Sequence, residues 1–277
     1  MKGLDYKVDN NLDTDQNPAG DNYWGDGLSY YEEYRGFMVK EVHRRTDPST
    51  KDLFVNNDAG LPLDSFMSAA KIPVHEITST QYGPLEDGYF EKNLKKKAKK
   101  YNIRFVNFNF SIGHVTNQKG LWLSNEVIPN RGGMSILGET PSETDEGGDN
   151  ITPAPPNWNI AVKVDRAKII AQCAKDPNDA LVEETKLQQV VAHELCHALN
   201  VYHHGEVSDG GLSSGDVECI MRYDNMGGRN EIPGTILCTA VKSANNTKDR
   251  GKCAFQLRVS GRWDIKNPTK GYPTKKL

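Results

Sequence analysis

Three histidines and a glutamate lie within eleven consecutive residues, at His193, Glu194, His197 and His203. Residues four apart on an α-helix lie one turn apart on the same face, so His193 and His197 can direct their imidazoles at one point. Imidazole nitrogen is a good zinc ligand, and a catalytic zinc site typically uses three protein ligands and a water. The spacing therefore predicts a helix that carries two ligands of one zinc ion.

The third histidine requires this helix to end. His203 lies six residues after His197, and a continuous helix would turn it by about 600°, away from the other ligands. Asn200 can end the helix, because asparagine, after glycine, most readily adopts the left-handed conformation that closes helices. The chain can then return and bring His203 to the metal. Glu194 is placed to reach the metal's water ligand and to act as general base.

The residues around the motif favour a helix. Asp179 is a candidate N-cap, and Glu183 and Glu184 follow near the positive end of the helix. Apolar residues recur at helical spacing, at Leu181, Leu187, Val190, Val191, Leu195 and Leu199. The alternative is an amphipathic helix whose histidines share no metal.

The motif resembles that of the metzincin zinc peptidases, H-E-x-x-H-x-x-G-x-x-H followed by a Met-turn. The match covers His193, Glu194, His197 and His203, and it departs at Asn200, where the family usually has glycine. The resemblance implies an α/β (α+β) fold, in which a twisted mixed sheet and the active-site helix lie above a smaller irregular C-terminal subdomain.

A second match lies downstream, where Ile220-Met221-Arg222-Tyr223 is similar to the Met-turn of astacin-like and serralysin-like members. By this resemblance Met221 occupies the tight turn beneath the zinc, and Tyr223 binds the zinc or stabilises the oxyanion. The alternatives are an ordinary core methionine and a tyrosine without a catalytic role. His204, after the third ligand, matches no common subfamily, so the subfamily stays open.

The resemblance also implies a domain organisation. We expect a metzincin-like catalytic domain over residues 61–277, with the upper subdomain to about residue 203 and the lower one over 204–277. Residues 1–60 are expected to be a polar arm and an appended segment, which can belong to the same domain. The patterns predict strands at residues 37–43, 51–55, 103–110, 121–127, 134–137 and 160–164, and helices at 64–70, 91–101 and 165–174. Residues 133–138 are the candidate edge strand for pairing with substrate, and residues 138–157 read as a long loop.

These features together predict a zinc-dependent endopeptidase that acts on protein or peptide substrates, with Glu194 as general base. One alternative is a non-cleaving, zinc-stabilised binding module with the same fold. Another is zinc-dependent hydrolysis of a non-peptide amide, which uses the same site chemistry.

A weaker pattern near the N-terminus suggests Ca²⁺ as a second cofactor. Asn22, Asp26, Gly27 and Glu33 fall on positions 1, 5, 6 and 12 of a calcium-loop template, but Trp24 occupies position 3. The alternative is a turn that starts a helix over residues 28–37.

Charge and hydropathy limit the expected partners. The net charge of −3 does not favour binding to nucleic acid or to anionic membranes, and no stretch is long enough for a membrane span. The first twenty residues lack the apolar segment of a signal peptide. Because metzincins are mostly secreted, we expect an extracellular protein in a mature or trimmed form. Among its five cysteines, Cys238 and Cys253 flank a polar loop, which suggests a disulfide in an oxidising compartment.

Overall fold

In the computed structural model, the described part of the chain comprises residues 26, 28, 30–78, 82–84, 104–106, 120–133, 135–140, 161–175, 183–199, 201, 219–221, 236–237, 253 and 257. A helix long and apolar enough to cross a membrane does not occur within these ranges.

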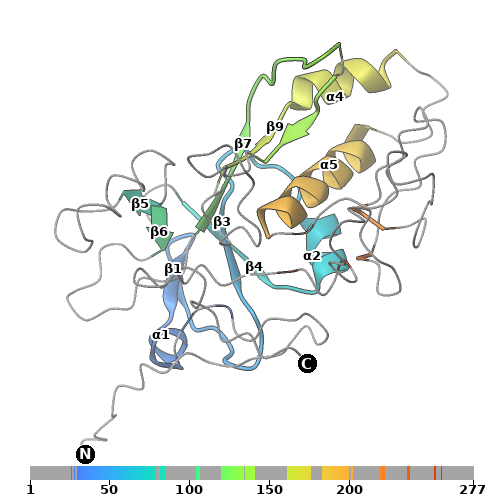
Figure 1. The fold of residues 1–277 in the computed structure, drawn as a ribbon. Helices are drawn as coiled ribbons and strands as arrows, with labels where there is room; N and C mark the ends of the chain where they lie inside the picture. Colours follow the sequence, from blue (N-terminus) through green and yellow to red (C-terminus); the bar gives the residue numbers. More distant parts are fainter. Residues whose placement is uncertain are drawn as a thin grey trace, which may run out of the picture.

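The centre of the fold is a five-stranded, mostly parallel sheet (Figure 1). In spatial order its strands are β4 (Val74–Ile77), β3 (Leu53–Asn56), β7 (Gly120–Asn125), β9 (Ala161–Val164) and β8 (Gly138–Glu139). The first four run parallel, and only β8, at the edge, runs antiparallel to its neighbour β9. The expected α/β class is therefore confirmed as a mixed α/β fold.

Three helices cover one face of the sheet: α2 (Asp64–Ala70), α4 (Arg166–Cys173) and α5 (Glu183–Ala198) (Figure 1). Side chains alternate between the two faces of a strand. Leu53 and Val55 of β3 accordingly join the core beneath the helices, as do Leu121 and Leu123 of β7. Burial of these aliphatic side chains holds α5 against the sheet.

The opposite face of the sheet carries a smaller apolar cluster. Phe54 of β3 points there and packs with Phe37, with ring centroids 4.7 Å apart, while Trp122 of β7 lies against the same cluster. The cover on this side includes Leu28 and the antiparallel hairpin of β1 (Phe37–Val39) and β2 (Val42–Arg44). The short helix α1 (Tyr30–Arg35) precedes the hairpin. A separate antiparallel pair is formed by β5 (Tyr82–Pro84) and β6 (Arg104–Val106).

The hairpin corrects the single strand expected over residues 37–43. Lys40 and Glu41 have φ of 48° and 63°, the left-handed values of a two-residue turn that matches the twist of hairpin strands. Gly36 precedes the hairpin with φ of 80°, and a Cβ there would lie 2.3 Å from the Arg44 carbonyl oxygen. Only glycine fits at that position. The chain reverses at Lys40 and Glu41, where the sequence pattern alone suggested a continuous strand.

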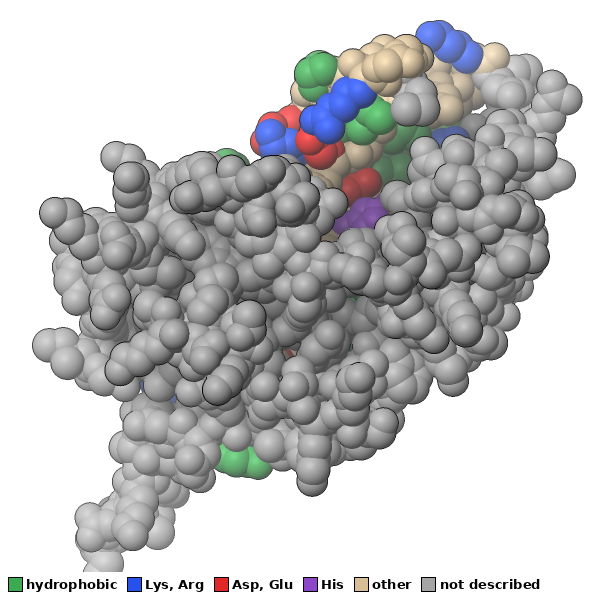
Figure 2. Space-filling model, in the orientation of Figure 1, with side chains coloured by type: hydrophobic (Ala, Val, Ile, Leu, Met, Phe, Trp, Pro, Cys, Tyr) green, Lys and Arg blue, Asp and Glu red, His purple; other side chains and the backbone are tan. Residues whose placement is uncertain are grey.

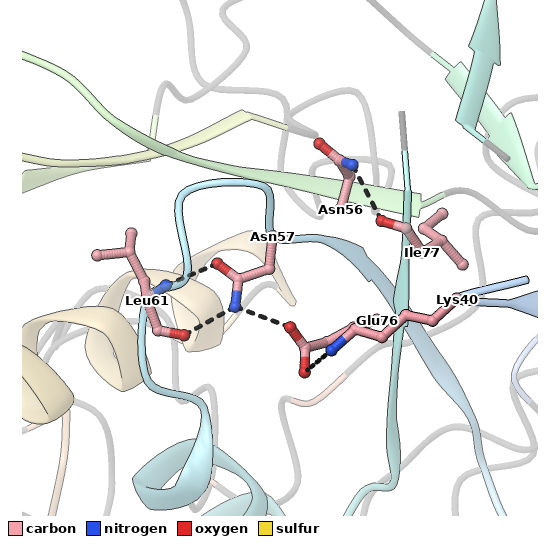
Figure 3. Close-up of polar contacts among 6 residues, drawn as sticks. All are labelled: Lys40, Asn56, Asn57, Leu61, Glu76 and Ile77. Carbon is pink, nitrogen blue, oxygen red and sulfur yellow. Dashed lines mark hydrogen bonds and ion pairs between the residues drawn. The ribbon is translucent and has the colours of Figure 1, made fainter. Parts of the chain in front are cut away.

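A polar network joins the hairpin, β3 and β4 (Figure 3). The Asn57 amide donates to the Leu61 carbonyl (2.7 Å) and to a Glu76 carboxylate oxygen (3.1 Å), and its Oδ1 accepts from the Leu61 N–H (2.9 Å). The other Glu76 oxygen accepts from Lys40 Nζ at 3.0 Å. These bonds hold the loop that leads into α2 against the sheet.

Several expected elements match the structure. The helix over residues 64–70 is confirmed, and the strands expected at 121–127 and 160–164 appear as β7 and β9 with shifted ends. The strand expected at 134–137 is wrong over residues 135–137, because regular pairing starts only at Gly138, where the loop 138–157 was expected. The helix expected at 91–101 lies outside the described residues.

Candidate metal centre

Two histidines on α5 converge on one point. The Nε2 atoms of His193 and His197 lie 3.1 Å apart, and the two rings meet edge to face, with centroids separated by 4.6 Å. Two nitrogens bound tetrahedrally to one zinc at 2.0–2.1 Å lie about 3.3 Å from each other. The spacing between these nitrogens is thus suited to a shared metal ion.

The second nitrogen of each ring is held by a backbone carbonyl. His193 Nδ1 lies 2.8 Å from the carbonyl oxygen of Ile220, and His197 Nδ1 lies 2.8 Å from that of Val201. A carbonyl only accepts hydrogen bonds, so each Nδ1 carries the proton and donates it. With the proton on Nδ1, it is Nε2 that can offer a lone pair to a metal, which is the arrangement common to metal-ligating histidines.

The protonation of His197 agrees with this reading. Burial, followed by the neighbouring His193, lowers the pKa of His197 to about 3. The ring is therefore neutral at physiological pH, which is the form that binds metal. Both histidines remain only partly buried. In Figure 2, histidine surface lies next to acidic surface.

Glu194 lies beside the first histidine, under the edge strand β8. Glu194 is 8% exposed. The Thr140 hydroxyl lies 2.8 Å from both the Oε2 and the backbone oxygen of Glu194, and these two oxygens share its hydrogen bond. At Gly138 an added Cβ would meet the Glu194 side chain at 2.5–2.9 Å. The strand and its following threonine thus confine this carboxylate.

The environment of Glu194 favours a carboxyl group that takes up a proton. Burial raises its pKa, against the opposing effects of His193 and Thr140, and Glu139 adds to the rise. A carboxylate with a raised pKa is a stronger base than one in water, as general-base catalysis requires.

The segment 219–221 lies against α5. Met221 is fully buried in the main core, and Ile220 supplies the carbonyl that accepts from His193. Cys219 forms a parallel bridge with Ile236, and the Ile220 N–H donates to the Ile236 carbonyl at 3.0 Å. The structure therefore places Met221 directly after the residue whose carbonyl holds the first histidine.

The end of α5 is also defined. The helix ends at Ala198, and the Val201 N–H donates to the Cys196 carbonyl at 3.0 Å, across five residues. Such a bond is typical of helices that close through a left-handed residue. The roles predicted for Asn200, His203 and Tyr223 fall outside the described residues.

A second group of candidate ligands lies on the other side of the sheet. Carboxylate oxygens of Asp26, Glu33 and Asp52 lie within 4.8 Å of one another, and all three residues are buried. Asp26 accepts from the N–H groups of Leu28 and Asp52, both at 2.8 Å, and Asp52 also bonds His75. Burial raises the pKa of Asp52, against the effect of His75. Such a cluster can hold a metal ion.

Sequence reasoning found only part of this cluster. Asp26 and Glu33 belong to the calcium-loop template, whereas Asp52, 26 residues further on, carries no sequence signal that links it to them. Asn22, Trp24 and Gly27, the remaining template positions, fall outside the described residues.

Comparisons with protein-family models, with curated proteins and with solved structures found no match to this chain.

Proposed function

We propose that the chain is a zinc-dependent endopeptidase. The observation that carries this proposal is the pair of Nε2 atoms of His193 and His197, 3.1 Å apart, with both Nδ1 atoms held by backbone carbonyls. A purely structural histidine pair has no need for this tautomer on both rings. The adjacent buried Glu194 provides the base that a non-cleaving zinc scaffold would not require.

In the proposed site, His193 and His197 would hold the zinc, with His203 as the third ligand implied by the metzincin resemblance. When bound, zinc lowers the pKa of a coordinated water to about 7 and polarises the substrate carbonyl. The chemistry of this metal fits the two imidazoles, because imidazole nitrogen is a preferred zinc ligand.

Glu194 performs the proton transfers. Thr140 holds Oε2, so Oε1 is the atom that we propose accepts a proton from the attacking water. The water oxygen then bonds to the peptide carbonyl carbon. Glu194 passes the proton to the amide nitrogen as the C–N bond breaks, and Tyr223 is proposed to stabilise the oxyanion.

The edge strand supports a peptide substrate. Among the residues that the structure describes, β8 pairs with β9 alone, and it lies next to Glu194. An extended peptide can add to such an edge through main-chain hydrogen bonds. We propose that Gly138 and Glu139 of β8, rather than residues 133–137, pair with the substrate.

We extend the proposal to the fold. The parallel sheet with one antiparallel edge strand, the packing of α5 on it and the buried Met221 support a metzincin-like catalytic domain, with residues 204–277 as its lower subdomain. An extracellular location remains part of this proposal, and fractionation of producing cells tests it.

The decisive experiment combines metal analysis with cleavage. Zinc per chain is measured by mass spectrometry, and a diverse peptide library is digested by wild type and by Glu194→Gln, which preserves size and removes the base. We expect one zinc in both proteins and cleavage only by wild type. Zinc binding with full cleavage by Glu194→Gln would refute the mechanism. Zinc binding without any cleavage by wild type would instead favour the binding module, or hydrolysis of a non-peptide amide.

A further inference from the structure

Two buried cysteines lie side by side near the candidate metal centre. The sulfur atoms of Cys219 and Cys253 are 3.8 Å apart, and the residues are 3% and 0% exposed. A disulfide bond is about 2.04 Å long, so the two sulfurs are separated by less than twice the length of that bond. They are 34 residues apart in the sequence, which means that the tertiary fold brings them together.

The position of Cys219 connects the cysteine pair to the candidate metal centre. It directly precedes Ile220, whose carbonyl accepts from His193, and Met221, which is buried in the core. A covalent link at Cys219 would anchor the segment 219–221 from its first residue. The other end of the link, Cys253, belongs to the same buried core.

We propose that Cys219 and Cys253 form a disulfide when the chain folds in the presence of a low-molecular-weight disulfide such as oxidised glutathione. One cysteine thiolate attacks the glutathione disulfide, forms a mixed disulfide and releases one glutathione thiolate. The second cysteine thiolate attacks the protein sulfur of that mixed disulfide and releases the second glutathione thiolate. The two protons lost by the cysteines end on the two released glutathione thiols.

Because both sulfurs are buried, the exchange takes place during folding, while the thiols can still reach the reagent. The finished bond then closes a loop that is open in the reduced chain. It lowers the conformational entropy of the unfolded state, and this stabilises the folded protein.

This pairing differs from the one that the sequence suggested. Cys238 and Cys253 flank a polar loop; Cys238 lies outside the described residues, and the sulfur of Cys253 lies 3.8 Å from that of Cys219. Cys196 on α5 is the other competitor. Its thiol is fully buried, and burial, followed by the neighbouring Cys219, raises its pKa.

The chain's own cleavage sites allow a direct test. The protein is refolded with reduced and oxidised glutathione, alkylated under denaturing conditions, and digested with trypsin together with a protease specific for glutamate. These proteases place each of the five cysteines on a separate peptide, since cleavage sites separate Cys173, Cys196, Cys219, Cys238 and Cys253.

We expect the peptide Cys219–Arg222 joined to Cys253–Arg258, with the loss of two hydrogens. A link from Cys253 to Cys238, a link from Cys219 to Cys196, or complete alkylation of Cys219 and Cys253 in folded protein would each overturn the proposal.

Thermal unfolding provides a second measurement. The oxidised wild type is expected to melt about 5–10 °C above the reduced wild type. Cys253→Ala should abolish this difference, whereas Cys173→Ala, which alters a half-buried cysteine on α4, should keep it. Equal melting temperatures of oxidised and reduced wild type would contradict the proposal, and the peptide analysis of wild type decides the matter if a variant fails to fold.

Discussion

The hydroxyl of Thr140 lies 2.8 Å from Oε2 of Glu194 and 2.8 Å from the backbone oxygen of the same residue. Thr140 follows the edge strand, and Glu194 is 54 residues further along the chain. The threonine therefore fixes the rotamer of the proposed base relative to the helix that carries the metal ligands. It is a positioning residue in the proposed mechanism, because it acts through Glu194.

Replacement of Thr140 tests this role. Thr140→Val keeps the shape and removes the hydrogen bond, and we expect kcat for peptide cleavage to fall about tenfold, the equivalent of one hydrogen bond of about 1.4 kcal/mol. KM and the zinc content should change little. Thr140→Ser keeps the hydroxyl and should retain most of kcat. Equal losses in both variants would indicate a role in packing instead.

Gly138 leaves room for the same carboxylate. A Cβ at this position would lie only 2.5 Å from the Glu194 Cγ, so the carboxylate side chain fits here because residue 138 is glycine. Gly138→Ala should displace the carboxylate and lower kcat at least tenfold without loss of zinc. Ser135→Ala, on the exposed segment before β8, is the control and should behave like wild type. Wild-type kinetics in Gly138→Ala would show that β8 lies further from Glu194.

Removal of a proposed metal ligand should abolish zinc binding. His197→Ala leaves a single imidazole on this helix face, so zinc per chain, measured after dialysis, should fall below about one-tenth of the wild-type value. His43→Ala alters an exposed histidine of β2 and should retain zinc. A chelator should abolish cleavage by wild type, and added zinc should restore it. Full zinc retention by His197→Ala would exclude the proposed centre.

Asp165 provides a pH-dependent contribution to stability. It caps α4 by accepting from the Lys168 N–H, and its other oxygen accepts from the Ile128 N–H, both at 2.9 Å. Burial acts to raise its pKa, but the hydrogen bonds from Ile128 and Lys168 outweigh burial, and the pKa lies below its usual value. The ionised form thus stabilises the folded state at neutral pH. This contribution is fully present above about pH 4 and is lost as the pH falls through the folded-state pKa.

The corresponding variant is Asp165→Ala. Loss of the buried bonds should lower the free energy of unfolding by about 1–2 kcal/mol at pH 7, measured by urea denaturation. The difference from wild type should shrink below pH 4, where the wild-type carboxylate becomes protonated. Asp165→Asn should show an intermediate loss. A difference that does not change with pH would mean that the charge has no part in the effect.

The acidic cluster makes the calcium prediction testable. Asp26, Glu33 and Asp52 offer three buried carboxylates, the ligand type that Ca²⁺ prefers. If Ca²⁺ binds there, saturation at about 100 times Kd should stabilise the fold by about 2.7 kcal/mol and raise the melting temperature accordingly. Glu33→Gln should remove this response, whereas Glu183→Gln on α5 should keep it. An unchanged melting temperature in wild type would argue against a calcium site. It would favour a cluster whose negative charge is reduced by protonation of the carboxylates and by His75.

Local patterns predicted those parts of the fold whose causes are local. The helix over residues 64–70 and the strand β9 follow from side-chain periodicity, and the αL residue Lys71 after Ala70 ends the first of them. The hairpin could not be read in this way, because the left-handed turn at Lys40 and Glu41 lacks the glycine or asparagine that signals one. The strand β8 is defined by its pairing with β9, and its two residues are too few to show the alternation of apolar and polar side chains that indicates a strand.

By itself, the sequence determined the spacing of His193 and His197, since residues four apart on a helix share a face whatever surrounds them. Only the tertiary structure decided which groups hydrogen-bond to the side chains of the candidate sites. His193 bonds to the Ile220 carbonyl, Glu194 accepts from the Thr140 hydroxyl, and Asp26 accepts from the Asp52 N–H. These partners lie 27, 54 and 26 residues apart, and no helical or strand period extends that far. Helix geometry is set by bonds within a few residues, whereas such contacts depend on strand order, register and the packing of α5 on the sheet.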